Sequence, residues 1–171
     1  MWLALYMEAT QGTHCALEVT WIMGDKGVPQ PDGFLRILPE YGGQSGLNEK
    51  GYGQGAPELI VEVTGSIVSR DLGNKLDLYE SIGVCEYVSV MVNSKKVIWR
   101  KRVGGRFRAI KTGKDGLFHS PTFPGLWLDP AAFWSSGKSI CTGLERGLKS
   151  PEHALFVKKL AASNAKIAAR T

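Results

Sequence analysis

Residues 59–64 (LIVEVT) form a short apolar run with a single acid, Glu62, near its centre. The run lacks the polar alternation of a half-buried strand, so it predicts a strand that is covered on both faces. An ionised carboxylate in such a strand costs on the order of 1–3 kcal/mol or more unless a partner compensates its charge. Glu62 therefore requires a cation, which must come from another part of the chain or from a bound metal.

The next segment, residues 69–82 (SRDLGNKLDLYESI), is predicted to form a helix, because its apolar side chains fall on one arc at helical spacing. Lys75 lies inside that arc, between Ile82 and Tyr79, and can face the preceding strand. Periodicity alone favours a Glu62–Lys75 ion pair that only positions the strand against the helix. Tyr79 is expected to be a core residue.

A second acid, Asp32, follows Pro31 and opens another apolar run (DGFLRIL). A divalent metal shared by Asp32 and Glu62 is the other way to compensate the buried charge. Hard cations such as Mg²⁺ or Mn²⁺ prefer a few carboxylate oxygens together with waters and substrate phosphate. With Lys75 to hold the attacking water or to stabilise the transition state, these three residues form a candidate site for phosphodiester hydrolysis.

The rest of the pattern predicts one α/β domain with a mixed sheet. The further expected elements are strands over 17–23, 32–38 and 86–92, a loop over 41–55, a hairpin over 96–111, and terminal helices over 137–148 and 151–168. No apolar run approaches the length that spans a bilayer. The three cysteines are far apart and show neither metal nor disulfide spacing, which is typical of a reducing cytoplasm.

Charge is distributed unevenly along the chain, whose net charge is +5. Residues 1–69 carry eight acids and three bases, whereas residues 70–171 carry eighteen bases and eight acids. The basic part suits a polyanion, although solvated surface lysines explain the C-terminal tail about as well. The predicted hairpin places Trp99 and Phe107 among several bases. These candidate nucleic-acid contacts are Lys96, Arg100, Arg102, Arg106 and Arg108. Bases that guard an exposed sheet edge are the alternative.

Four motifs in this order closely resemble the Uma2 family of restriction-endonuclease-like proteins, which belongs to the PD-(D/E)XK nuclease superfamily. The motifs are PD at 31–32, APELIVEV at 56–63, SRDLGNKLDLY at 69–79 and GVCEY at 83–87. Further matches are the glycine pair at 104–105, PGLWL at 124–128 and EHALFV at 152–157. The resemblance implies a restriction-endonuclease-like mixed β-sheet flanked by helices, with a β-hairpin extension and C-terminal helices. It also implies a nuclease-like core over 1–134, with 135–171 as a helical extension of the same domain.

The resemblance further implies a metal-dependent DNA endonuclease in the cytoplasm, and a homodimer by analogy with nucleases that cut both strands. Asp32 and Glu62 would bind Mg²⁺ or Mn²⁺ together with the backbone carbonyl of Val63, and Lys75 would replace the motif lysine, whose usual position holds Thr64. The family carries a further N-terminal segment, including a helix with an acidic residue, ahead of the position of residue 1. Its lack here keeps an alternative open, in which a catalytically inactive nuclease fold binds nucleic acid or a partner. Glu58 is expected to be an exposed residue at the end of its strand, or an acid behind the site.

Overall fold

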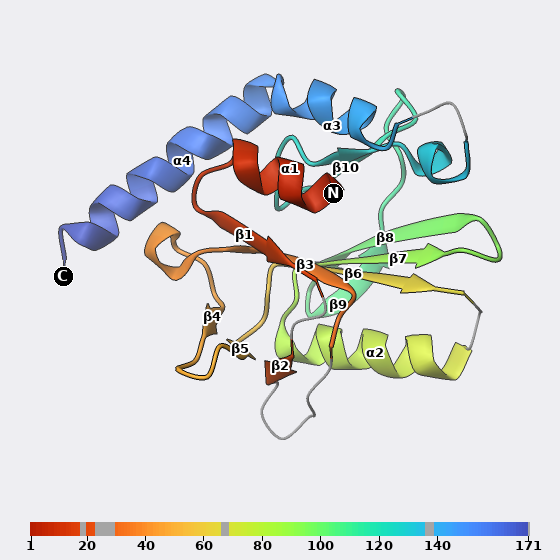
Figure 1. The fold of residues 1–171 in the computed structure, drawn as a ribbon, viewed down its shortest axis with the longest axis horizontal. Helices are drawn as coiled ribbons and strands as arrows, with labels where there is room; N and C mark the ends of the chain where they lie inside the picture. The colour runs from red at the N-terminus through yellow and green to blue at the C-terminus, as the bar shows by residue number, and fades with distance from the viewer. Residues whose placement is uncertain (18–19, 23–29, 66–68, 136–138, 171) are drawn as a thin grey trace.

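A six-stranded mixed sheet forms the centre of the computed structural model, which describes residues 1–17, 20–22, 30–65, 69–135 and 139–170 (Figure 1). Its strand order is β1-β3-β6-β7-β8-β9. The strands are β1 (Thr13–Ala16), β3 (Gly33–Ile37), β6 (Leu59–Thr64), β7 (Glu86–Met91), β8 (Lys96–Val103) and β9 (Arg106–Ala109). In the described part of this sheet, β6 and β7 are the one parallel pair, and α2 (Ser69–Ile82) connects them. The mixed α/β architecture predicted from the sequence is thereby confirmed.

Helices cover both faces of this sheet (Figure 1). Helix α2 lies on one face, whereas α1 (Trp2–Ala9), α3 (Cys141–Leu148) and α4 (Pro151–Ala168) lie on the other. Because successive side chains of a strand point to opposite faces, Val61 faces α1 and Glu62 faces α2. Apolar side chains of α3 and α4, among them Leu144 and Phe156, join the same core as the strands. No helix in the described part of the chain is long and apolar enough to cross a membrane.

The segment 17–23 does not form the single strand that the sequence predicts. The sheet strand lies earlier, at β1, and pairs antiparallel with β3, while residues 18–19 and 23 lie outside the described residues. Leu17 is 66% exposed, whereas Trp21 is fully buried in a separate short strand, β2 (Trp21–Ile22). The residues of β1 (THCA) carry no apolar periodicity, so only their pairing with β3 makes them a strand.

The glycine-rich segment 41–55, which the sequence predicts to be a loop, contains two short strands. These are β4 (Gly46–Leu47) and β5 (Gly53–Gln54), which form a small sheet with β2 beside the main one. A short 3-10 helix, η2 (Pro39–Tyr41), precedes them. Later in the chain, β10 (Phe118–His119), β11 (Trp127–Leu128) and the 3-10 helix η3 (Pro130–Trp134) lie between the hairpin and α3.

The β8–β9 hairpin turns where the sequence predicts, through Gly104 and Gly105, whose φ angles of +59° and +82° suit a tight turn of this kind. The end of α2 anchors it. Glu80 accepts hydrogen bonds from the backbone N–H of Phe107 and from Arg106 Nη1, the latter at 2.9 Å. Arg102 Nε donates to the Glu80 backbone carbonyl at 3.1 Å. Two of the hairpin's arginines therefore bind the protein's own helix.

Glu80→Gln is expected to destabilise the protein in a pH-dependent way. The Phe107 N–H and the Arg106 guanidinium lower the pKa of Glu80 in the folded state below its unfolded value of about 4.3. The stabilisation is therefore fully present above that pH and is lost as the pH falls through the folded-state pKa. Urea unfolding from neutral to acid pH should show a gap between wild type and Glu80→Gln that narrows below about pH 4. The exposed Glu145→Gln on α3 is the matched control, and a gap of constant size would contradict the prediction.

Candidate active site

The candidate site forms where α2 crosses the C-terminal half of β6. Glu62 is 3% exposed, and each of its carboxylate oxygens accepts a hydrogen bond from α2. Lys75 Nζ lies 2.7 Å from Oε2, and the Tyr79 hydroxyl donates to Oε1 at 2.6 Å. Lys75 and Tyr79 are four residues apart, so they project from the same side of the helix. The predicted pairing of Glu62 with Lys75 is thus present in the structure.

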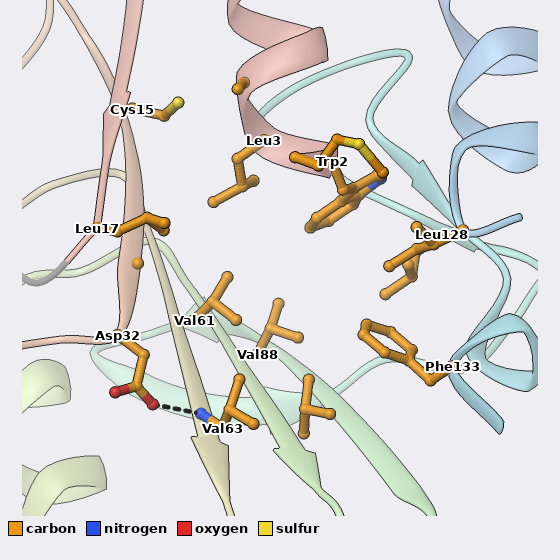
Figure 2. A pocket seen from close by; sticks show the side chains of 15 residues that line it. Trp2, Leu3, Cys15, Leu17, Asp32, Val61, Val63, Val88, Leu128 and Phe133 are labelled. Atoms are coloured by element: carbon orange, nitrogen blue, oxygen red, sulfur yellow. Dashed lines mark hydrogen bonds between the residues drawn. The ribbon is translucent and has the colours of Figure 1, made fainter.

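Asp32 reaches the same end of β6 from the strand on its other side. The ladder between β3 and β6 ends at Gly33, which lies opposite Val61, and Asp32 comes just before it. Asp32 Oδ2 accepts a hydrogen bond from the backbone N–H of Val63 at 2.6 Å (Figure 2). Burial raises the pKa of Tyr79, and its hydrogen bond to Glu62 and the charges of Glu62 and Asp32 raise it further.

The backbone of Val63 presents its carbonyl to the same edge of β6. In a strand, the N–H and C=O of one residue point to the same side, so the Val63 carbonyl lies on the side of Asp32. The next residue points the other way, because the Thr64 carbonyl accepts from Val92 of the β7 end at 2.8 Å. Glu62, Asp32 and the Val63 carbonyl thus offer oxygen donors at one strand end.

This donor set fits a hard divalent cation. In the part of the chain that the structure describes, no three His, Cys, Asp or Glu side chains cluster as a metal site would require. Two carboxylates and one carbonyl nevertheless match Mg²⁺, which usually keeps several waters and takes further oxygens from substrate phosphates. Soft thiolate or imidazole ligands, which zinc prefers, are absent from this group of residues.

Tyr79 has a second role beyond the core role that the sequence predicts. Its ring packs in the core beside Tyr87, with centroids 5.5 Å apart, while its hydroxyl holds Glu62. This hydroxyl fixes one carboxylate oxygen and leaves Lys75 to pair with the other. The helical spacing of four residues between Lys75 and Tyr79 is the sequence signal that could have revealed it.

Glu58 is not exposed, so that expectation is wrong. Its side chain is 5% exposed, and it accepts hydrogen bonds from the backbone N–H groups of Ile37 and Gln44 at 2.8 and 3.1 Å. Burial raises the pKa of Glu58 despite these donors. Two backbone donors make burial of this carboxylate tolerable, and they tie the start of β6 to β3 and to the segment after it.

The five candidate nucleic-acid residues lie on the β8–β9 hairpin and have different partners. Arg102 and Arg106 contact Glu80 at the end of α2, as described above. Lys96 and Arg108 are exposed, as are Arg102 and Arg106. Arg100 lies on the face that carries Glu62, where its Nη1 donates to Ser89 Oγ at 3.0 Å.

An apolar pocket of about 300 Å³ opens on the opposite face of the sheet, toward α1. Figure 2 shows the side chains of Val61, Val63 and Val88 projecting into it below Trp2, with Asp32 at its rim. The lining of the pocket is almost entirely apolar. Asp32 belongs both to this lining and to the carboxylate site.

The fold defines a class, the mixed α/β proteins with a nuclease-like fold. The chain belongs to the Uma2 family, because that family's model, described as "Putative restriction endonuclease", matches residues 1–131. A solved structure titled as a "putative nuclease belonging to DUF820" from Anabaena variabilis resembles this one with a TM-score of 0.52 at 15% identity. The match covers 86% of this chain and 75% of that one, and at this identity it shows the shared fold. No curated protein matches the chain.

Proposed function

We propose that this protein is a metal-dependent DNA endonuclease that hydrolyses phosphodiester bonds at Asp32, Glu62 and Lys75. One observation carries the proposal, namely that three residues from separate elements meet at one strand end. Lys75 lies 2.7 Å from Glu62, and Asp32 lies 2.6 Å from the amide nitrogen of the residue after Glu62. Membership of a family described as nucleases supports the same conclusion.

Each residue has a distinct proposed role. Asp32, Glu62 and the Val63 carbonyl would hold Mg²⁺ or Mn²⁺, which supplies Lewis-acid polarisation of the phosphate and a water of lowered pKa. Lys75 would orient the attacking water or donate to the phosphoryl oxygens as their charge grows. Its side chain is 31% exposed, so the ammonium group is within reach of a substrate as well as of Glu62. Tyr79 would keep Glu62 in position.

One observation favours a second function, a catalytically inactive nuclease fold that binds nucleic acid or a partner. Both oxygens of Glu62 already accept hydrogen bonds, from Lys75 and from Tyr79. A closed arrangement of this kind also serves to pack a strand against a helix. For the protein to be an active nuclease, Glu62 would have to bind the metal while Lys75 also contacts the substrate.

Plasmid cleavage tests the proposal. Wild-type protein is expected to nick supercoiled plasmid with Mg²⁺ or Mn²⁺ and not with EDTA. Asp32→Asn, which keeps the shape of the side chain and removes its charge, should lower the rate at least about 100-fold, because a metal ligand is lost. Asp77→Asn on the exposed side of α2 makes the same charge change and should cleave as wild type does.

Cleavage that survives Asp32→Asn with unchanged metal dependence would show that other residues do the chemistry. Wild-type protein that binds DNA but cleaves it with neither metal would favour the inactive alternative. A homodimer would offer one site to each strand of a duplex, and light scattering of the protein in solution tests that part of the proposal.

A further inference from the structure

Four polar or aromatic side chains share the sheet face beneath α2. Glu62 lies opposite Ser89 in the register of β6 and β7, and Tyr87 lies opposite Arg100 in the register of β7 and β8. Residues opposite one another on neighbouring strands project to the same face. Neighbouring strands are about 4.8 Å apart, so Ser89 is immediately beside Glu62. Arg100 Nη1 reaches Ser89 Oγ at 3.0 Å and therefore brings a cation close to the candidate site.

Arg100 is a partly buried cation that pairs with no acid among the residues that the structure describes. Its guanidinium lies over the Tyr87 ring, 5.6 Å from the centroid. Among the described residues, no carboxylate lies within the 4.0 Å of an ion pair with it, whereas Arg106 has Glu80. Burial lowers the pKa of Arg100, which reflects the cost of removing this charge from water. A buried cation of this kind is stabilised when an anion binds next to it.

Tyr87 supports Arg100 from the same sheet face. The residue is fully buried, and within the described chain its hydroxyl has no partner in hydrogen-bonding geometry. Burial raises the pKa of Tyr87. The Ser89 hydroxyl, Arg100 and Lys75 lower it, whereas the charge of Glu62 raises it. The registers of β6, β7 and β8 place Tyr87 on the same sheet face as Glu62, Ser89 and Arg100.

We propose that Arg100, which the Ser89 hydroxyl holds over the Tyr87 ring, is a second phosphate-binding point of the active site and takes a DNA backbone phosphate next to the one that is cut. This inference rests on the proposed function and names the part of the substrate that the sheet face contacts. Two partly exposed cations, Lys75 and Arg100, would then hold successive phosphates of one strand on either side of Ser89. Among the hairpin's arginines, Arg100 lies beside Ser89 on the face of the candidate site, whereas Arg102 and Arg106 contact Glu80.

DNA binding in EDTA tests this point without cleavage. A fluorescent duplex is titrated with wild type and Arg100→Met between about 50 and 200 mM salt. Arg100→Met should bind about tenfold more weakly and should lower the slope of log K against log salt by about 1, because one phosphate contact is lost. Lys101→Met is the matched control. Lys101 is the next residue of the same strand, is exposed and points to the opposite face, so its slope should equal that of wild type.

Arg100→Lys separates charge from packing. It keeps a cation above Tyr87 and should retain the wild-type salt slope, and thermal unfolding of each variant shows whether it is folded. Three outcomes would overturn the inference. The first is a wild-type salt slope in folded Arg100→Met. The others are a loss of affinity and slope in Lys101→Met, or in Arg100→Lys, as large as that in Arg100→Met. If wild type cleaves plasmid while Arg100→Met keeps its slope, only this inference fails. If wild type neither binds nor cleaves DNA, the proposed function fails with it.

Discussion

Lys75→Met is expected to slow metal-dependent DNA cleavage by about 10²–10³-fold, the usual loss when one donor to the charge of a transition state is removed. The ammonium group lies 2.7 Å from Glu62 and is the cation nearest to that carboxylate among the described ion pairs. Methionine has a similar length and packs on the same apolar arc, so the helix itself should be retained. Plasmid cleavage under single-turnover conditions measures the effect.

The same substitution should cost stability, and this cost must be separated from catalysis. Glu62 is buried and would keep only the Tyr79 hydroxyl. Breaking a buried pair costs about 3–5 kcal/mol, and because Lys75 is about a third exposed we expect a smaller loss of about 2 kcal/mol in the free energy of unfolding. Urea unfolding of wild type and Lys75→Met measures this loss of stability.

Lys75→Arg distinguishes a chemical role from a purely structural one. Arginine keeps the charge beside Glu62 and should recover most of the lost stability, but its planar guanidinium places its donors differently from an ammonium group. If Lys75 acts on the substrate, Lys75→Arg will be stable and still slow. If both stability and cleavage return to wild-type values, Lys75 only compensates the charge of Glu62, and its proposed role is wrong.

Glu86→Ala is expected to lower the free energy of unfolding by about 4 kcal/mol or more. Glu86 is fully buried at the start of β7, and burial raises its pKa. Its carboxylate accepts three hydrogen bonds, from Ser120 Oγ at 2.7 Å, from the Thr122 N–H at 2.6 Å and from Trp99 Nε1 at 2.5 Å. Alanine would leave three buried donors unpaired, each costing about 1–3 kcal/mol.

This loss is a large part of the roughly 5–15 kcal/mol that stabilises an ordinary domain. Glutamine keeps one acceptor oxygen, but its NH2 group would face partners that also donate hydrogen bonds. Glu86→Gln should therefore lose about half as much stability as Glu86→Ala. The exposed Glu145→Ala on α3 should unfold at the same urea concentration as wild type. A Glu86→Ala protein within about 1 kcal/mol of wild type would show that these three hydrogen bonds contribute little.

Local patterns in the sequence predict the elements that bear the site. The helix over 69–82 and the strand over 59–64 have the predicted bounds, because apolar spacing sets helical and strand periodicity. The place of Lys75 on the inner side of α2 follows from the same spacing. The resemblance to the Uma2 family is likewise confirmed.

Other features depend on contacts between distant parts of the chain. The sequence predicts Glu58 to be exposed, but the N–H groups of Ile37 and Gln44 make its burial possible. Arg100, Arg102 and Arg106 have the same charge and alternate along one hairpin, yet Glu80 engages two of them and leaves one beside Ser89. No periodicity within a segment encodes these partners, since they depend on which strands and helices meet.

By itself, the sequence determined that Glu62 lies in a covered strand and that Lys75 faces it from the next helix, because desolvation and helical spacing act within one short stretch. Only the tertiary structure decided that Asp32 joins them. The antiparallel register of β3 and β6 stops at Gly33 opposite Val61, so the carboxylate of Asp32 reaches the Val63 amide. A shift of one residue in that register would have turned the side chains of β3 to the opposite faces.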